Sequence, residues 1–305
     1  MRVSVIVPVR NGASDVRVLL GHLDRQTLPR RDFEVVIADD GSTDAEIADF
    51  ASADDSIRVL SAPPENSYAA RNRAVRASTA DVLAFCDADC RPEPEWLERG
   101  LHSLRDTDIL AGRFKFDLPS PRNVWALIDM DGSKDHEHQV RLGLAETANL
   151  FLRRELFDRV GGFDGSVPEY GDFEFVQRCV AQDYRLSYAA DVVVCHPVRS
   201  SGNSLLRALW KYNRGYGVHE GRAGRIPDAV KLRSWVPVVQ TARGRRRWNR
   251  SLLGPDRQWL RQNGVEPRTE EVIRSLPVMY LVIPYLRSLA QLRGWLDGRR
   301  LRSAG

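Results

Sequence analysis

The chain has 305 residues, of which 43% are hydrophobic and 28% charged, and its formal net charge is +4. These fractions are ordinary for a folded globular protein, and the length suits one large domain or a domain with an appendage. The composition excludes a repeat or low-complexity protein, and no apolar run approaches the roughly 20 residues of a membrane-spanning helix.

Short apolar runs alternate with helical patterns over the first 116 residues. Strands are predicted at Val3–Val9, Phe33–Ala38, Ile57–Leu60, Asp81–Cys86 and Asp108–Phe116. Helices are predicted at Ser14–Arg25 with Ser14 as a candidate N-cap, after the capping box Thr43–Glu46, at Ser67–Ala77 and from Pro94 to Leu104. This alternation predicts βαβ units, and therefore an α/β fold with a mainly parallel sheet flanked by helices.

The pattern is less regular between residues 117 and 225. Further strands are predicted at Thr147–Leu152, Leu186–Ala189 and Val192–Cys195. Helices are predicted at Arg154–Val160, which Gly161 and Gly162 end, at Glu174–Ala181, and from Leu205 through Tyr212. Residues 226–305 form a separate compositional unit that is rich in Arg, Trp and Pro.

The cysteines and the amino terminus indicate a reduced, cytosolic protein. None of the four cysteines belongs to a Cys-x-x-Cys pair, so neither a disulfide framework nor a zinc framework is expected. The apolar run at residues 3–9 follows Met1 almost directly and is too short and wrongly flanked for a signal peptide. We therefore expect a cytoplasmic location.

Polar clusters follow three of the predicted strands, namely Arg10-Asn11-Gly12, Asp39-Asp40-Gly41-Ser42 and Asp87-Ala88-Asp89. Parallel strands bring their carboxyl ends, where ligands bind, to one edge of a sheet. Asp-x-Asp at a strand end is suited to hold Mg²⁺ or Mn²⁺ against a diphosphate, because these hard ions take oxygen ligands. Together the clusters favour a nucleotide site over ordinary solvated loops.

A nucleotide sugar needs a partner for its nucleobase, a cation for its diphosphate and a general base for the acceptor hydroxyl. Asp39 or Asp40 could accept a hydrogen bond from the nucleobase, and Arg71 could bridge base or phosphate. Asp89 would hold the cation, with Asp87 near the ribose or completing the metal shell.

The candidate general base is Asp172, and Glu169 and Glu174 are its neighbours and rivals. Asp172 is also interpretable as a helix N-cap carboxylate, a role compatible with catalysis. His196, which follows a predicted strand, is either a third metal ligand or a structural histidine.

His136 and His138 have a spacing that could bind a metal ion. The favoured interpretation for this pair is nevertheless a flexible, exposed acceptor loop.

Taken in chain order, these segments resemble family-2 glycosyltransferases of the GT-A fold from Val3 to roughly Tyr216. The resembling segments are residues 3–12, Asp39–Asp44, Ala70–Asn72, Asp87–Asp89, Asn149–Arg154 and Gly161–Asp164. The resemblance implies inverting transfer from a nucleoside-diphosphate sugar with the help of Mn²⁺ or Mg²⁺. Carried over by position, it places Pro8, Val9, Asn11, Asp39, Asp40, Arg71 and Asp87 at the nucleotide, Asp89, Asp87 and His196 at the cation, and Asp172 as base.

The chain departs from the family pattern at two places. Gly171-Asp172 stands where the family usually has Glu-Asp, which puts an acceptor contact in doubt and leaves Glu169 or Glu174 to compensate. Gln177-Arg178 lacks the Gln-x-x-Arg-Trp signature of processive relatives. We therefore expect transfer of a single sugar.

The expected organisation is a GT-A domain at residues 1–225, with a nucleotide-binding half at 1–116 and an acceptor-side half at 117–225, followed by a helical, Arg-rich extension at 226–305. The segment Arg243–Arg261 contains seven arginines and one acid, and the apolar segment Leu276–Leu286 is followed by more arginines. This pattern is typical of a peripheral contact with the inner face of a membrane. The alternative is a helical cap on the catalytic domain or on a second subunit.

Two other functions compete with the glycosyltransferase. A sugar nucleotidyltransferase would need a glycine-rich loop after the first strand, where residues 8–12 offer one glycine. A non-catalytic nucleotide-sugar binding protein would explain the missing glutamate. UDP is the favoured donor nucleotide, with GDP and dTDP open, and the acceptor is a glycan, a lipid-linked saccharide, a polysaccharide precursor or a small molecule. The arginine stretch carries no fold signature of a nucleic-acid partner.

Overall fold

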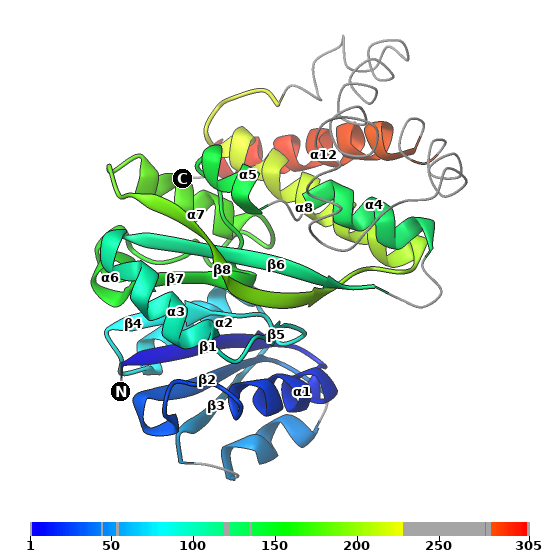
Figure 1. Ribbon diagram of the computed structural model, residues 1–305. Helices are drawn as coiled ribbons and strands as arrows, with labels where there is room; N and C mark the ends of the chain where they lie inside the picture. Colours follow the sequence, from blue (N-terminus) through cyan, green and yellow to red (C-terminus); the bar gives the residue numbers. More distant parts are fainter. Residues whose placement is uncertain are drawn as a thin grey trace. The chain divides into compact units, whose positions relative to one another are not determined.

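The computed structural model describes residues 2–43, 45–52, 55–118, 123–133, 136–227, 278 and 282–303. The chain divides into two compact units, each built from two separate stretches (Figure 1). The first unit comprises Met1–Lys115 and His136–Pro197, and the second Phe116–Asp135 and Val198–Gly305. The domain boundaries expected at residues 116 and 225 cut the chain differently and stay a prediction.

A mixed sheet of eight strands forms the centre of the first unit, in the order β3-β2-β1-β4-β7-β6-β8-β5. Its strands are β1 (Val3–Val9), β2 (Phe33–Asp40), β3 (Ile57–Ala62), β4 (Val82–Phe85), β5 (Arg91–Pro92), β6 (Ile109–Asp117), β7 (Leu150–Arg153) and β8 (Leu186–Pro197). The four strands β3-β2-β1-β4 are parallel, whereas β7 pairs antiparallel with β4 and β6, and β5 pairs antiparallel with β8. The predicted α/β fold class is confirmed.

The helices of the first unit are α1 (Ala13–Leu23), α2 (Ser67–Ala77), α3 (Trp96–Ser103), α5 (His136–Arg141), α6 (Arg154–Val160) and α7 (Gly171–Val180). Short 3₁₀ turns lie at Arg30–Asp32, Ala45–Ser52, Leu104–Asp106 and Thr147–Asn149. Helix α2 packs against β1 and β2, and α3 packs against β8. Every residue of β1 and β2 is buried, as expected for central parallel strands that are covered on both faces.

Several local expectations are corrected by the structure. Gly12, and not Ser14, is the N-cap of α1. The predicted capping box does not open an α-helix, because Thr43 donates to the side chain of Asn11 and the segment that follows is 3₁₀. The two short strands predicted after residue 185 form the single strand β8, and α7 begins three residues earlier than expected, at Gly171.

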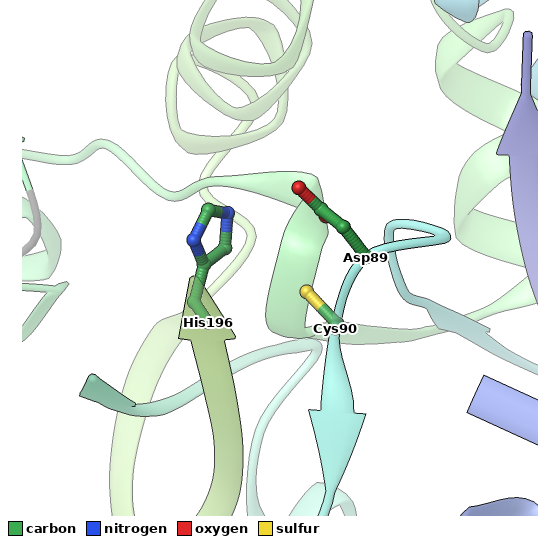
Figure 2. Close-up of side chains that lie close together, drawn as sticks. All are labelled: Asp89, Cys90 and His196. Atoms are coloured by element: carbon green, nitrogen blue, oxygen red, sulfur yellow. The ribbon is translucent and has the colours of Figure 1, made fainter. Parts of the chain in front are cut away.

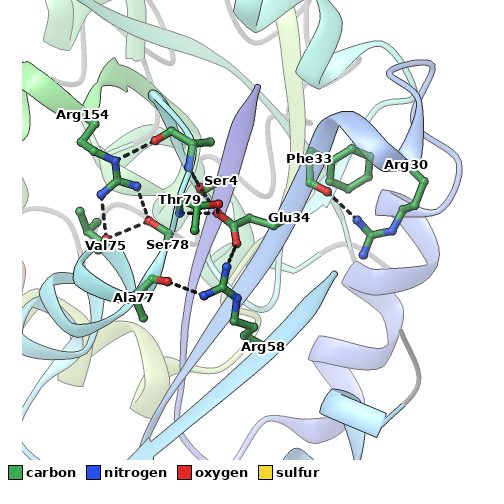
Figure 3. A network of polar contacts seen from close by, with 11 residues as sticks. Ser4, Arg30, Phe33, Glu34, Arg58, Val75, Ala77, Ser78, Thr79 and Arg154 are labelled. Carbon is green, nitrogen blue, oxygen red and sulfur yellow. Dashed lines mark hydrogen bonds and ion pairs between the residues drawn. The ribbon is translucent and has the colours of Figure 1, made fainter. Parts of the chain in front are cut away.

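A buried carboxylate crosslinks the amino-terminal ends of the parallel strands (Figure 3). Glu34, in β2, accepts hydrogen bonds from the Ser4 hydroxyl at 2.7 Å and from Thr79, and it pairs with Arg58 at 2.6 Å. Burial raises the pKa of Glu34, but these hydrogen bonds and the charge of Arg58 outweigh it and hold the pKa below its ordinary value. Beside it, Arg154 donates to the carbonyls of Val75 and Ala80 and so closes the same edge.

The described part of the second unit consists of α4 (Val124–Ser133), α8 (Gly202–Arg222) and α12 (Ile283–Ser303). Helices α8 and α12 pack along their length, because Gly217 and Gly221 face the backbone of α12 while Gly294 and Gly298 face the backbone of α8. Side chains at these positions would collide with the partner helix. No helix of the described residues is long and apolar enough to cross a membrane. The stretch Arg243–Arg261 and most of Leu276–Leu286 lie outside the described residues.

Candidate active site

Two aspartates end β2 at the carboxyl edge of the sheet. The strand is two residues longer than predicted, so that Asp39 and Asp40 lie within it, and Asp39 pairs in register with Val9 of β1. Both side chains are buried, and each is oriented by a backbone amide: Ser42 donates to Asp39 at 2.9 Å, and Glu65 donates to Asp40 at 2.8 Å. These hydrogen bonds hold two carboxylates at the edge where parallel sheets bind ligands.

The loop after β1 is fastened to the loop after β2 by Asn11. This residue has a left-handed backbone with φ of 53°, a conformation that asparagine tolerates better than most residues. Its amide N–H donates to Ser42 Oγ at 2.8 Å, and its side-chain oxygen accepts from the Thr43 amide at 2.8 Å. Pro8 and Val9 are the last two residues of β1 and are buried, so they form part of the apolar surface beneath these loops.

Arg71 and Asp87 form an ion pair between α2 and the loop after β4, at 2.5 Å. The arginine side chain is buried, and its Nε lacks a hydrogen-bond partner among the described residues. Its guanidinium also lies 5.5 Å from the ring centroid of Tyr68, one helical turn earlier. An unsatisfied nitrogen on a buried cation is costly, and an anionic ligand is the kind of group that would satisfy it.

Asp172 lies in the first turn of α7, where Tyr68 donates to its Oδ1 at 3.1 Å. Burial, and after it the negative charge of Glu146, raises the pKa of Asp172 to about 6, although Arg71 and hydrogen bonds from Phe173 and Tyr68 act in the opposite direction. A carboxyl group with a pKa near neutrality is suited to accept a proton during catalysis.

The N-cap interpretation of Asp172 is wrong. Tyr170, which has a left-handed backbone, occupies the N-cap position of α7 and makes no side-chain cap. Asp172 is the second residue of the helix.

The two neighbouring glutamates differ in their surroundings. Glu174 is bound to Arg178 at 2.5 Å, and the same arginine donates to the carbonyls of Val160 and Gly162. Glu169 is half-buried, and its charge contributes to raising the pKa of Tyr68. Glu174 therefore helps to hold the loop after α6 through Arg178, whereas the charge of Glu169 acts on Tyr68, the partner of Asp172.

Asp89, Cys90 and His196 gather at the other side of this edge, with their candidate ligand atoms all within 4.8 Å of one another (Figure 2). His196 Nδ1 lies 2.6 Å from the carbonyl oxygen of Pro197, which can only accept, so Nδ1 carries the proton and Nε2 the lone pair of the neutral ring. The carboxylate and this imidazole form a donor set that fits a divalent cation.

The cluster differs from the predicted metal site in two respects. Asp87 is not part of it and pairs with Arg71 instead. Cys90, which the sequence analysis did not consider as a ligand, is part of it. Its place directly after Asp-x-Asp was the available signal. Tyr68 and Glu146 were also missed, because no pattern in the sequence connects them to Asp172.

The interpretation of residues 136–138 as an exposed loop is wrong for His136. This histidine begins α5, is buried, and stacks on Phe114 at 4.8 Å between ring centroids. Its Nδ1 donates to the Gly112 carbonyl, and its Nε2 accepts from the Glu146 amide. Both nitrogens are engaged by the backbone, so His136 is structural.

Comparisons with known proteins agree on one family. The model for glycosyl transferase family 2 matches residues 4–163. The chain is 34% identical over 220 residues to glycosyltransferase AglE of Haloferax volcanii, which covers 70% of this chain and 72% of that protein. It is 31% identical over 209 residues to the pre-mycofactocin glycosyltransferase of Mycobacterium tuberculosis, covering 65% of this chain and 43% of that protein. The match thus spans less than half of the second relative.

Solved structures share the fold. The mannosyltransferase PcManGT from Pyrobaculum calidifontis, in complex with GDP-Man and Mn²⁺, superposes with a TM-score of 0.59 at 18% identity, covering 97% of this chain and 86% of that chain. TarS 1–349 of S. aureus in complex with UDP-GlcNAc superposes with a TM-score of 0.54 at 17% identity, covering 100% and 91%. The expected GT-A architecture is confirmed by these neighbours.

Proposed function

Because this chain belongs to glycosyl transferase family 2, we propose that it transfers one sugar from a nucleoside-diphosphate sugar to an acceptor hydroxyl, with inversion at the anomeric carbon. The observation that carries the proposal is the double role of α2. Within one helical turn, Tyr68 holds Asp172 and Arg71 holds Asp87. A candidate general base and a candidate donor-binding group are therefore positioned by the same rigid element.

In the proposed reaction, Asp172 accepts the proton of the acceptor hydroxyl while the acceptor oxygen attacks the anomeric carbon. The carbon–oxygen bond to the diphosphate breaks on the opposite face, so the configuration inverts. Asp172 must be ionised to act, and its pKa of about 6 leaves it ionised near neutral pH yet basic enough to take a proton. Glu169 and Glu174 are the alternative bases.

On the donor side, Asp39 and Asp40 are proposed to bind the nucleobase and Arg71 the base or the diphosphate. The buried Nε of Arg71, which has no hydrogen-bond partner among the described residues, supports an anion at this place. Pro8, Val9 and Asn11, at the end of β1 and in the loop after it, are proposed to contact the same nucleotide, and Asp87, which pairs with Arg71, to meet the ribose. When bound at Asp89 and His196, Mn²⁺ or Mg²⁺ would stabilise the negative charge of the departing diphosphate.

The donor nucleotide is proposed to be UDP, with GDP and dTDP as alternatives, and the acceptor to be a glycan, a lipid-linked saccharide or a small molecule. One structural neighbour binds GDP-Man and another UDP-GlcNAc, so nucleotide sugars of both kinds suit the fold. We further propose non-processive transfer, because Gln177-Arg178 lacks the signature of processive relatives.

The test is the release of nucleoside diphosphate from a panel of UDP-, GDP- and dTDP-sugars with Mn²⁺, Mg²⁺ or EDTA. We expect slow hydrolysis of one donor that requires the cation. The anomeric configuration of the released sugar, read by NMR at early times, reports inversion. Hydrolysis that EDTA leaves unchanged would contradict the role of Asp89 and His196, and retention would contradict direct attack assisted by Asp172.

A peripheral membrane contact is proposed for the second unit. Leu289 and Leu296 are exposed seven residues apart on α12, and Val282, just before the helix, is exposed as well. Arg293 and Arg300 are exposed on the same helix. An apolar stripe with arginines beside it suits an anionic lipid surface.

Co-sedimentation with vesicles containing anionic lipid tests this contact. The double variant Leu289→Glu, Leu296→Glu should lose binding. Val18→Glu, at an exposed apolar residue of α1, is the matched control and should bind like the parent protein. Equal binding of the parent protein, the double variant and the control would contradict a membrane contact through α12.

A further inference from the structure

The cation cluster contains a sulfur donor that hard-cation chemistry does not call for. Mn²⁺ and Mg²⁺ prefer oxygen ligands, and Asp89 with the diphosphate of a donor would supply them. Cys90 nevertheless lies with Asp89 and His196 in a group whose ligand atoms are all within 4.8 Å of one another (Figure 2). Oxygen, sulfur and nitrogen donors at this separation are the set that Zn²⁺ and related thiophilic ions take.

The backbone holds Cys90 opposite His196. Strand β5 pairs antiparallel with β8, with Arg91 facing Cys195 and Pro92 facing Val194. Extending this register by one residue beyond β5 places Cys90 opposite His196, and the two side chains lie near each other in Figure 2. The turn before it is closed by the Cys90 amide, which donates to the Asp87 carbonyl at 3.1 Å. Because residues directly opposite on antiparallel strands have neighbouring side chains, the thiol and the imidazole are brought together by main-chain pairing.

The donors differ in how far they are prepared for binding. The Cys90 thiol donates to the Ala148 carbonyl at 3.8 Å and burial raises its pKa, so a cation has to displace this proton. The Pro197 carbonyl fixes the proton of His196 on Nδ1, which leaves Nε2 as the coordinating nitrogen. Cys90 and His196 are buried, whereas Asp89 is the most exposed of the three, so an ion can enter from the carboxylate side. A cation bound here would have its sulfur and nitrogen ligands on the buried side. A coordination position on the exposed side would remain for water or a phosphate oxygen.

We infer that Asp89, Cys90 and His196 form a binding site for a thiophilic divalent cation such as Zn²⁺ or Cd²⁺, and that Cys90 is the residue that gives the site this preference. On binding, the S–H bond of Cys90 breaks, a sulfur–metal bond forms and the proton passes to water, with no change of oxidation state. Binding needs no nucleotide. Its consequence, competition with Mn²⁺ or Mg²⁺ and inhibition of transfer, rests on the proposed function.

Titration of the full-length protein with Cd²⁺ alone, without nucleotide, tests the inference. A cadmium–thiolate bond gives a charge-transfer absorption in the ultraviolet that oxygen and nitrogen ligands do not give. We expect this absorption to saturate at one Cd²⁺ per chain. Cys90→Ser should abolish this absorption. His196→Gln should weaken Cd²⁺ binding by at least about tenfold, but the full absorption should still appear at a high Cd²⁺ concentration, because the thiolate is retained.

The matched control is Cys179→Ser, a buried thiol in α7 outside the cluster. It should keep the absorption, and circular dichroism of both serine variants should show that each is folded. Absence of the absorption in the parent protein, or its loss in Cys179→Ser with retention in Cys90→Ser, would overturn the inference. Cd²⁺ binding without sugar transfer would contradict only the proposed function, and Mn²⁺-dependent transfer without Cd²⁺ binding would contradict only this inference.

Discussion

The two ends of the sheet in the first unit use buried charge in opposite ways. At the amino-terminal ends of the strands, Glu34 is bonded to Ser4, Thr79 and Arg58, and its pKa is lowered. At the carboxyl ends, Asp172 has its pKa raised to about 6. A hydrogen-bonded and paired charge contributes to the stability of the fold. A buried carboxyl group with a raised pKa costs stability when ionised and is suited to take up a proton, as a general base must. The comparison favours the carboxyl edge as the candidate functional one without reference to any relative.

The largest expected effect is on catalysis, from Asp172→Asn. Removal of the general base should lower kcat by about 10²-fold or more while donor affinity is kept. The measurement is single-turnover transfer beside equilibrium binding of the nucleotide. Normal turnover would move the role of base to Glu169 or Glu174.

The same variant should also change stability, with a definite pH dependence. The folded carboxyl keeps its proton up to about pH 6, whereas the ordinary value is 3.8, so the folded state binds more protons between these values and stability falls as pH rises through this window. Asp172→Asn should therefore stabilise the protein by about 3 kcal/mol at pH 8 relative to pH 4, where its effect is small. Urea unfolding at the two pH values measures this, and a loss of stability at pH 8 would contradict it.

At the opposite end, Glu34→Ala should destabilise the fold by about 3 kcal/mol, because it leaves buried donors and Arg58 unpaired. Urea unfolding measures the loss. The control is Glu137→Ala, which removes the exposed pair with Arg141 and should cost less than about 0.5 kcal/mol. Similar losses of unfolding free energy in both variants would mean that the buried network around Glu34 stabilises the fold no more than an exposed ion pair does.

A smaller effect is expected from Tyr68→Phe. The Tyr68 hydroxyl stabilises the ionised form of Asp172, so its removal should shift the acid limb of the pH–rate profile upward by roughly half a unit. Tyr184→Phe, which removes a hydroxyl bonded to Arg159 on the surface, is the control and should leave the profile unchanged. If the acid limb of Tyr68→Phe is not shifted, the Tyr68 hydroxyl does not stabilise the ionised form of the catalytic base.

Glu146→Gln should shift the same limb in the opposite direction. The charge of Glu146 raises the pKa of Asp172, so the neutral side chain should lower the limb by at least as much as Tyr68→Phe raises it. The variant keeps the backbone amide that His136 accepts from, so α5 should stay in place. An upward shift would show that the two carboxylates interact through something other than their charges.

Local sequence was sufficient for most elements of residues 1–116 and for the places where polar residues gather. The alternation of apolar runs predicted β1 and α2 with their observed bounds, because a buried strand and an amphipathic helix each impose a period on the chain. It also predicted that Asp87 and Asp89 follow a strand, whereas Asp39, expected just after β2, lies within it. Residues from 228 onward, apart from 278 and 282–303, lie outside the described structure, so the extension remains a prediction there.

Which side chains meet was decided only by the tertiary structure. Asp87 and Asp89 are two residues apart, yet one pairs with Arg71 and the other joins Cys90 and His196. The pairing of β5 with β8 brings Cys90 and His196 together across 106 positions of sequence, and α2 brings Tyr68 to Asp172 across 104. Periodicity reports the burial of each element by itself, but the pKa of a group and the ligands of an ion depend on neighbours that only strand order and helix packing supply.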